Sequence, residues 1–256
     1  MSAIKYTVLG SGTSMGVPVI GCKCDVCRSS DVKDKRLRTS LLIETDSTTV
    51  VIDCGPDFRQ QMLSRDIDRL DGVVFTHEHK DHTAGVDEVR AFNFILNKEV
   101  VFWATDRVEA ALRHDYHYAF GDLKYPGTPS IRFSRVGDAP FEIGNMEFVP
   151  IHVLHHKLPV TAYRIGKLTY ITDANFIPDE EWSKITGTEV LIINALRRSS
   201  HLSHFTLDQA IEIARKLGVK TTYFIHISHQ MGRHAEIEST LPEGMHLAYD
   251  GLVIEL

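Results

Sequence analysis

The feature that most constrains this chain is the run His77-Glu78-His79-Lys80-Asp81-His82, which directly follows a short apolar segment. An apolar stretch of this length is typical of a buried strand, so the run lies where a strand ends and the chain turns toward a helix. Alternation places His77 and His79 on one side of the extended part, while Asp81 and His82 lie at the turn. Because packing does not require such polar groups there, the run predicts a loop that binds two metal ions. Imidazole and carboxylate ligands suit Zn²⁺, Mn²⁺ or Fe²⁺.

The composition is that of an ordinary soluble globular chain. It has 256 residues, 43% of them hydrophobic and 24% charged. No linker, repeat or low-complexity tract divides it, so we expect one hydrolase domain over residues 1–256. The start of the chain lacks the features of a secretory signal, and no apolar run reaches membrane-spanning length, so we expect a cytoplasmic protein without a membrane partner.

The net charge of -6 argues against nucleic acid as the main partner. Binding to a phosphate backbone requires clustered lysines and arginines. A small-molecule substrate fits better, and a locally basic pocket would still suit a phosphate group.

Strands and helices alternate along the whole chain. The pattern predicts strands at 4–9, 41–45, 50–54, 72–76, 100–104, 131–135, 146–153, 161–165, 168–172, 190–194, 222–227 and 248–255, and helices at 56–65, 107–118 and 207–217. Strand pairs followed by helices recur in both halves, which predicts an α/β sandwich with helices outside two central sheets.

The glycine loop 10–16 follows the first strand. Val17-Pro18 comes after it instead of a helix start, so a dinucleotide-binding loop is not expected. Two interpretations remain open: a tight turn, and a loop whose backbone N–H groups border the active site.

The cysteines are spaced for a metal and not for a disulfide framework. Cys22, Cys24 and Cys27 lie within six residues, and Cys54 stands alone. Three thiolates are one ligand short of a closed tetrahedral zinc site, which His229 can complete. The alternative is three reduced, metal-free thiols. We expect Cys54 to be a buried apolar residue.

The pattern His-x-His-x-Asp-His after a strand resembles the signature of the metallo-β-lactamase superfamily. The segment 51–55 resembles the strand of that family that ends in Asp-x-Gly, whose aspartate, here Asp53, steadies the metal loop. The resemblance implies the metallo-β-lactamase fold, a four-layer αββα sandwich. It also implies a later histidine, aspartate and histidine at strand ends, which match His155, Asp173 and His226. His152 and His156 are the alternatives to His155.

The family pattern divides these ligands between two catalytic divalent metals, zinc or manganese. One metal is held by His77, His79 and His155, the other by Asp81, His82 and His226, and Asp173 bridges the two. A bridging carboxylate neutralises part of the charge of two cations and favours a closely spaced pair. Lactamases of this superfamily commonly have a cysteine in that position and are exported, so lactam hydrolysis is not expected.

Three features together resemble the phosphoribosyl cyclic phosphate phosphodiesterases of phosphonate breakdown. They are Gly-Ser-Gly-Thr-Ser-x-Gly-Val-Pro at 10–18, the Cys-x-Cys-x-x-Cys loop, and His-x-x-His at 226–229. The similarity spans almost the whole chain. It implies attack of a metal-bridged hydroxide on a small cyclic phosphodiester, one structural zinc at Cys22, Cys24, Cys27 and His229, and a homodimer.

In that family a histidine between the bridging aspartate and the last ligand acts as general acid. His204, at the start of a predicted helix, matches it, and His201 is the alternative. Fold and metal site are shared across many reactions. A glyoxalase-type thioester hydrolase, a tRNA 3′-processing nuclease and a non-catalytic metal-dependent binding protein therefore remain as alternative functions.

Overall fold

The computed structural model describes residues 3–121 and 126–256, in which two seven-stranded sheets face each other. The first sheet has the order β14 (Val253–Glu255), β1 (Lys5–Gly10), β2 (Ser40–Glu44), β3 (Thr49–Ile52), β4 (Gly72–Val74), β5 (Val100–Ala104), β6 (Ile131–Arg135). The second has the order β13 (Met245–Leu247), β12 (Thr221–Ile225), β11 (Val190–Asn194), β10 (Leu168–Ile171), β9 (Leu158–Ile165), β8 (Met146–His155), β7 (Phe141–Ile143).

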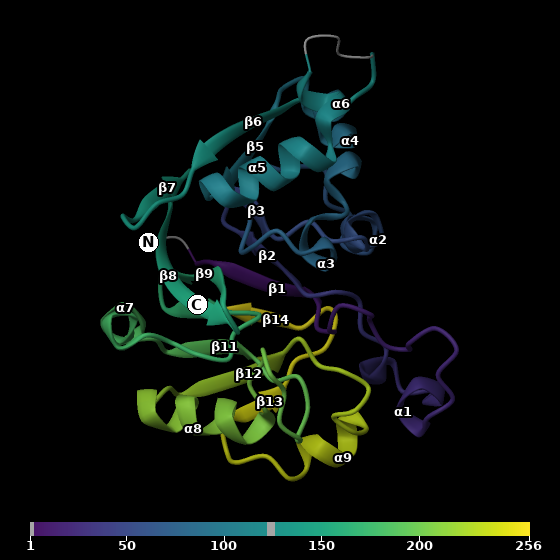
Figure 1. The fold of residues 1–256 in the computed structure, drawn as a ribbon, viewed down its shortest axis with the longest axis vertical. Helices are drawn as coiled ribbons and strands as arrows, with labels where there is room; N and C mark the ends of the chain where they lie inside the picture. Colours follow the sequence, from purple (N-terminus) through teal and green to yellow (C-terminus); the bar gives the residue numbers. More distant parts are fainter. Residues whose placement is uncertain (1–2, 122–125) are drawn as a thin grey trace.

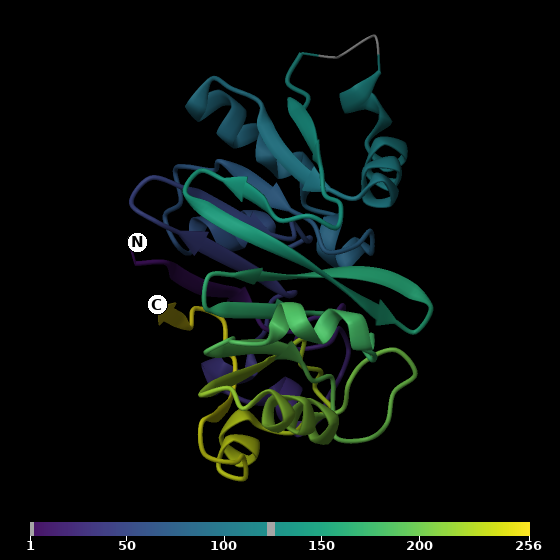
Figure 2. The ribbon, with the colours of Figure 1, turned by 90° about the vertical axis from the view of Figure 1, so that its left-hand side faces the viewer.

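Helices cover the outer face of each sheet, which gives the four layers that the sequence predicts (Figures 1 and 2). The first sheet is covered by α2 (Phe58–Leu63), α3 (Lys80–Thr83), α4 (Arg90–Leu96), α5 (Asp106–Asp115) and α6 (His117–Phe120). The second is covered by α7 (Trp182–Ile185), α8 (Leu207–Leu217) and α9 (His234–Glu238). The short helix α1 (Asp25–Arg28) lies on a segment that projects from the sandwich (Figure 1). Among the described residues, no helix is both long and apolar enough to cross a bilayer.

The core lies in three apolar layers, one between the sheets and one under each set of helices. Successive residues of a strand point to opposite faces, so Val50 and Ile52 of β3 pack between the sheets while Val51 packs under the helices. Strands that are buried on both faces need apolar residues at nearly every position. This explains why the central strands are continuous apolar runs.

The parallel strands end at the same edge of the sandwich. β3 and β4 run parallel, as do β10, β11 and β12. Polar residues lie at or within two residues of the ends of these strands. Loops at the carboxyl ends of parallel strands are where open α/β sheets place functional groups. The topology therefore brings residues from both halves of the chain to one edge.

Several predicted elements differ from those observed. The closing strand predicted at 248–255 is too long: only its last three residues form a strand, β14 in the first sheet, and Gly251, with φ of 93°, lies in the turn before it. β13, in the second sheet, ends before the predicted range and was not predicted. The helix predicted at 107–118 ends at Asp115 and is followed by α6, and the helix predicted at 56–65 spans only Phe58–Leu63. The short elements α4, α7, α9 and β7 have too few residues for a clear periodic signal.

Candidate metal centre

Asp53 organises the histidine run. It follows β3 with φ of 63° and is completely buried. Its carboxylate accepts hydrogen bonds from the backbone N–H and the hydroxyl of Thr76, both at 2.8 Å, and from Nδ1 of His82 at 2.7 Å. Because a carboxylate only accepts, the Nδ1 of His82 carries the proton and its Nε2 is free to bind a metal.

Two glycines allow the histidine run to pack closely against the end of β3. A side chain at Gly55 would collide with the carbonyl oxygen of Asp81, and one at Gly85 would collide with that of Gly55. The backbone N–H of Cys54 also donates to the carbonyl of His82 at 2.8 Å. The metal loop is therefore held by backbone contacts as well as by Asp53.

Two further site residues, Asp173 and His226, follow β10 and β12 in left-handed conformations, with φ of 54° and 57°. This conformation is unusual for residues other than glycine and tends to occur at functional sites. The Oδ1 of Asp173 lies 3.2 Å from Nε2 of His226, and its Oδ2 lies 3.3 Å from Nε2 of His82. One carboxylate thus reaches two histidines that are 144 positions apart in the sequence.

Ligand-type atoms gather in groups that share Asp173, two of which include residues of the histidine run. One group contains Asp81, His82, Asp173 and His226, and the other contains His77, His79 and Asp173; within each, the atoms lie within 4.8 Å of one another. Among the described residues, the buried Nε2 atoms of His77, His82 and His226 have no hydrogen-bond partner. Buried nitrogens that lie beside carboxylate oxygens without forming hydrogen bonds fit a pair of divalent cations, because a cation supplies the missing interaction.

His155 ends β8 and lies against the same cluster. Its Nδ1 donates to the carbonyl of Ser203 at 2.7 Å, and its ring centre is 5.2 Å from that of His79. Its ligand-type atom forms a group with those of Asp173 and His204, within 4.8 Å of one another. Of the two alternatives, His152 contacts Asp138 at 2.8 Å, and His156 is exposed at the turn after β8. The structure brings His155 to the site, and its role as a ligand stays a prediction.

His204 is buried beside the cluster. Its ring centre lies 4.4 Å from that of His155 and 4.7 Å from that of His226. Burial, together with the neighbouring imidazole of His226, lowers the pKa of His204 to about 2, so its side chain is neutral at pH 7 when no substrate is bound. His201 is exposed, and its ring centre lies 5.2 Å from that of His204. The geometry therefore favours His204 over His201 as the group next to the ligand cluster.

The charges of the cluster suit cation binding. Burial alone would raise the pKa of Asp173, but the imidazoles of His226 and His82 hold it well below its usual range. Burial would lower the pKa of His82, yet the surrounding carboxylates raise it above its usual value. The pKa of His77 is lowered by burial and by His82. Ionised carboxylates and neutral imidazoles are the ligand forms that divalent cations require, so Asp173 and His77 are in the required forms, whereas His82 must release its additional proton when a cation binds.

The second predicted metal site also assembles. The sulfurs of Cys22 and Cys24 lie 3.3 and 3.4 Å from Nδ1 of His229, and all four ligand atoms, including that of Cys27, are within 4.8 Å of one another. A hydrogen bond from the backbone N–H of Cys27 and one to His229 lower the pKa of Cys24 to about 6, whereas burial raises the pKa of Cys27 to about 11. A metal would stabilise all the thiolates together. Cys54 is completely buried, as expected.

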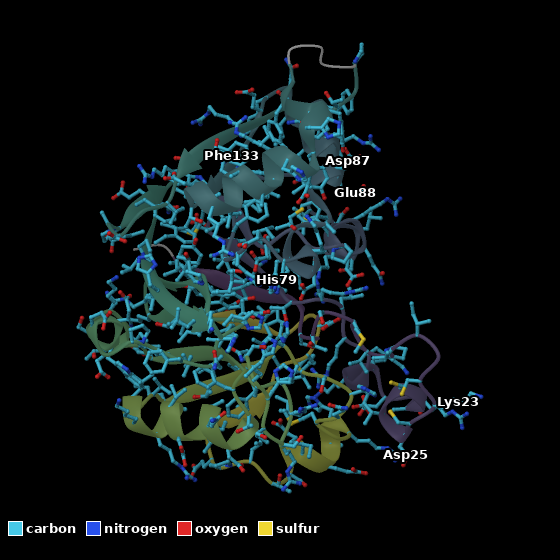
Figure 3. The ribbon with its side chains drawn as sticks, in the orientation of Figure 1. Lys23, Asp25, His79, Asp87, Glu88 and Phe133 are labelled. Atoms are coloured by element: carbon cyan, nitrogen blue, oxygen red, sulfur yellow. The ribbon has the colours of Figure 1, made fainter. Side chains whose placement is uncertain are left out.

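Figure 3 shows how far the two sites are separated. His79 lies at the junction of the two halves of the sandwich, while Lys23 and Asp25 lie on the projecting segment that carries the cysteines. The sites are nevertheless joined by the short segment 226–229, because His226 belongs to the first site and His229 to the second.

The glycine loop supports this segment. The backbone N–H of Thr13 donates to the carbonyl of Ile227, and the N–H of Ile227 donates to the carbonyl of Ser11. The N–H groups of Ser11 and Gly12 donate to the Asp250 carboxylate and the Leu37 carbonyl. These donors are occupied within the protein, which favours a tight turn over a loop whose backbone N–H groups border the active site.

Comparison with known proteins agrees with the fold. The profile of the β-lactamase superfamily domain matches residues 48–227. The crystal structure of a diphosphatase from the PhnP family is 41% identical, with a TM-score of 0.93 over 99% of this chain and 97% of that one. The chain therefore belongs to the β-lactamase superfamily, in its PhnP-like branch, and is a hydrolase with the metallo-β-lactamase fold. This fold implies a divalent metal.

Two curated proteins show further similarity. An octanoyltransferase of Porphyromonas gingivalis is 43% identical over 252 residues, which cover 97% of this chain and 51% of that protein. Ribonuclease Z 1 of Schizosaccharomyces pombe is 24% identical over 242 residues, which cover 81% of this chain and 30% of that protein. The chain thus spans about half the length of the first relative and less of the second.

Sequence reasoning assigned no role to Asn194, which ends β11 between the strands that lead to Asp173 and His226. The sequence feature that could have identified Asn194 is its position as a polar residue directly after the apolar run Val-Leu-Ile-Ile. The same signal marks the other strand ends at the site.

Proposed function

We propose that this chain is a phosphodiesterase that opens a small cyclic phosphodiester of the phosphoribosyl cyclic phosphate type, with two divalent cations at the groups that share Asp173. The observation that carries the proposal is this shared carboxylate, with His204 beside it. The similarity to a PhnP-family diphosphatase supports chemistry at phosphorus.

In this proposal His77, His79 and His155 hold one cation, Asp81, His82 and His226 hold the other, and Asp173 contacts both. Two cations held in this way supply a water of lowered pKa as the nucleophile and neutralise the phosphate oxygens. Asp53 keeps His82 in the tautomer that binds metal, and Ser203 does the same for His155. A third, structural zinc is held by Cys22, Cys24, Cys27 and His229.

His204 then supplies the leaving-group proton. As water adds to phosphorus, the bond from phosphorus to the sugar oxygen breaks, and that oxygen takes a proton from the imidazole to give a phosphate monoester and an alcohol. A sugar alkoxide is a poor leaving group, so the proton contributes a factor of roughly 10²–10⁴. An anionic phosphodiester beside His204 favours the protonated imidazole, which opposes the effect of burial on its pKa.

A second candidate reaction is hydrolysis of a diphosphate, which the 41% identity to a diphosphatase favours. Because the chain spans about half of the Porphyromonas gingivalis relative, the name octanoyltransferase does not identify the activity of the matched half. The expected homodimer and the preference for a small molecule over nucleic acid stay predictions.

A turnover screen of the metal-loaded protein tests the proposal. The substrates are cyclic phosphodiesters, linear diesters, diphosphates, thioesters, lactams and tRNA precursors. We expect the highest kcat/KM on cyclic phosphodiesters. A preference for thioesters or tRNA would contradict the proposal, and no turnover of any of them would favour a metal-dependent binding protein.

A further inference from the structure

We infer that Asn194 is a positioning residue for the metal centre: its side-chain amide holds the backbone of Ala174 and thereby fixes both Asp173 and His204. The inference rests on the proposed function, in which Asp173 is the shared ligand. Asn194 is completely buried at the end of β11. Its strand lies between β10 and β12, which lead to Asp173 and His226.

Asp173 adopts a left-handed backbone conformation just after β10. β10 and β11 pair in parallel up to Ile171 and Ile193, and the φ of 54° at Asp173 then turns the chain out of the ladder. Ala174 follows, is completely buried, and needs partners for its backbone N–H and C=O.

The side chain of Asn194 supplies both partners. Its Oδ1 accepts from the N–H of Ala174 at 2.8 Å, and its Nδ2 donates to the carbonyl of Ala174 at 2.9 Å. A side-chain amide carries the same donor and acceptor as a peptide group, so it takes the place of the missing ladder partner. The two hydrogen bonds from Asn194 to Ala174 therefore stabilise the backbone conformation that directs the Asp173 carboxylate toward the cluster.

The backbone of Ala174 is also hydrogen-bonded to the segment that carries His204. The carbonyl of Ala174 also accepts from the N–H of Phe205 at 2.8 Å. The residue after Asp173 is therefore bonded to the residue after His204. Beyond Asn194, the N–H of Ala195 donates to the carbonyl of Ile225, which precedes His226, and the N–H of Leu196 donates to the carbonyl of Phe205. The segment 194–196 contacts each of the three segments that deliver Asp173, His204 and His226.

The test is Asn194→Leu, which has a similar branched shape, is larger, and cannot make either hydrogen bond. The chain offers a matched control in Asn93, whose side chain makes comparable bonds far from the site: Nδ2 donates to the carbonyls of Lys98 and Ser130, and Oδ1 accepts from the N–H of Ser130, each at 2.9 Å. Asn93→Leu should therefore destabilise the fold without disturbing the cluster. Asn194→Thr, which suits a strand end but is too short to hold both groups, carries the test if the leucine variant folds poorly.

Metal affinity is measured by competition of the metal-free protein with a chromophoric chelator for Zn²⁺, and cation spacing by the electron paramagnetic resonance spectrum of a bound Mn²⁺ pair. For the Asn194 variants we expect affinity about 10–100-fold weaker than for the wild type and loss of the coupled-pair signal. Asn93→Leu should keep both.

Two results would overturn the inference: Asn194 variants that bind the cation pair like the wild type, or an equal loss of affinity in Asn93→Leu, which would indicate general destabilisation. If the wild-type protein itself binds no cation pair, the proposed function fails, and the inference fails with it. The wild-type titration therefore shows whether the proposed function has failed or only the role of Asn194.

Discussion

Nδ1 of His82 and Oδ2 of Asp53 lie 2.7 Å apart, and both side chains are shielded from solvent. The other carboxylate oxygen accepts the backbone N–H of Thr76 at 2.8 Å. These contacts determine which nitrogen of His82 faces the metal cluster, and they lead to the first prediction.

Asp53→Asn should weaken cation binding by about 10–100-fold. The asparagine oxygen must still accept from Thr76, so its NH₂ group faces His82 and favours the tautomer whose Nε2 carries the proton. A protonated nitrogen cannot bind a metal. Isothermal titration with Zn²⁺ measures the effect. Asp71→Asn is the control, because Asp71 also accepts a backbone N–H, from Thr49, at the opposite end of β3 and β4. Wild-type affinity in Asp53→Asn would exclude this role.

Asp173→Ala should abolish the closely spaced cation pair. The carboxylate of Asp173 lies near histidines of both ligand groups, whereas that of Asp81 belongs to only one. Metal analysis should therefore show loss of at least one catalytic cation per chain, and a Mn²⁺-loaded sample should lose its coupled spectrum. A crystal structure of the variant with both cations still close together would refute the assignment.

Cys24→Ser should remove a zinc ion that is separate from the catalytic pair. In the wild type we expect this zinc to persist after mild chelation has removed activity, because a closed thiolate site holds zinc tightly. Elemental analysis before and after chelation measures it. Cys54→Ala is the control, since Cys54 is buried away from the cluster of sulfurs. Loss of all metal in one step from the wild type, or an unchanged zinc content in Cys24→Ser, would count against the site.

His204→Ala should keep both catalytic cations and lose kcat by roughly 10²–10⁴ on a diester with a poor alkoxide leaving group. On a nitrophenyl diester the loss should be much smaller, because that leaving group departs as a stabilised anion. His201→Ala, a change at the neighbouring exposed histidine, should have a weaker effect. An equal loss on both substrates would indicate a structural role for His204, and full activity would transfer the role to His201.

The sequence by itself determined the local parts of this protein. The histidine run and the cysteine loop are contiguous, so spacing alone shows which residues share a turn and what chemistry they offer. The order of apolar strands and amphipathic helices predicted the four-layer sandwich, because periodicity reports which faces are buried. The resemblance then named the later ligand positions, and the structure brings His155, Asp173 and His226 to one edge.

Only the tertiary structure decided what depends on distant pairing. His155 is distinguished from His152 and His156 by where β8 ends and by the carbonyl of Ser203, which lies 48 positions later in the chain. The placement of β13 in the second sheet and β14 in the first depends on which strand edges are free. Asn194 hydrogen-bonds both backbone groups of Ala174 because the left-handed residue Asp173 interrupts the pairing of β10 with β11. Such contacts follow from the register and packing of whole sheets, which no local pattern of residues encodes.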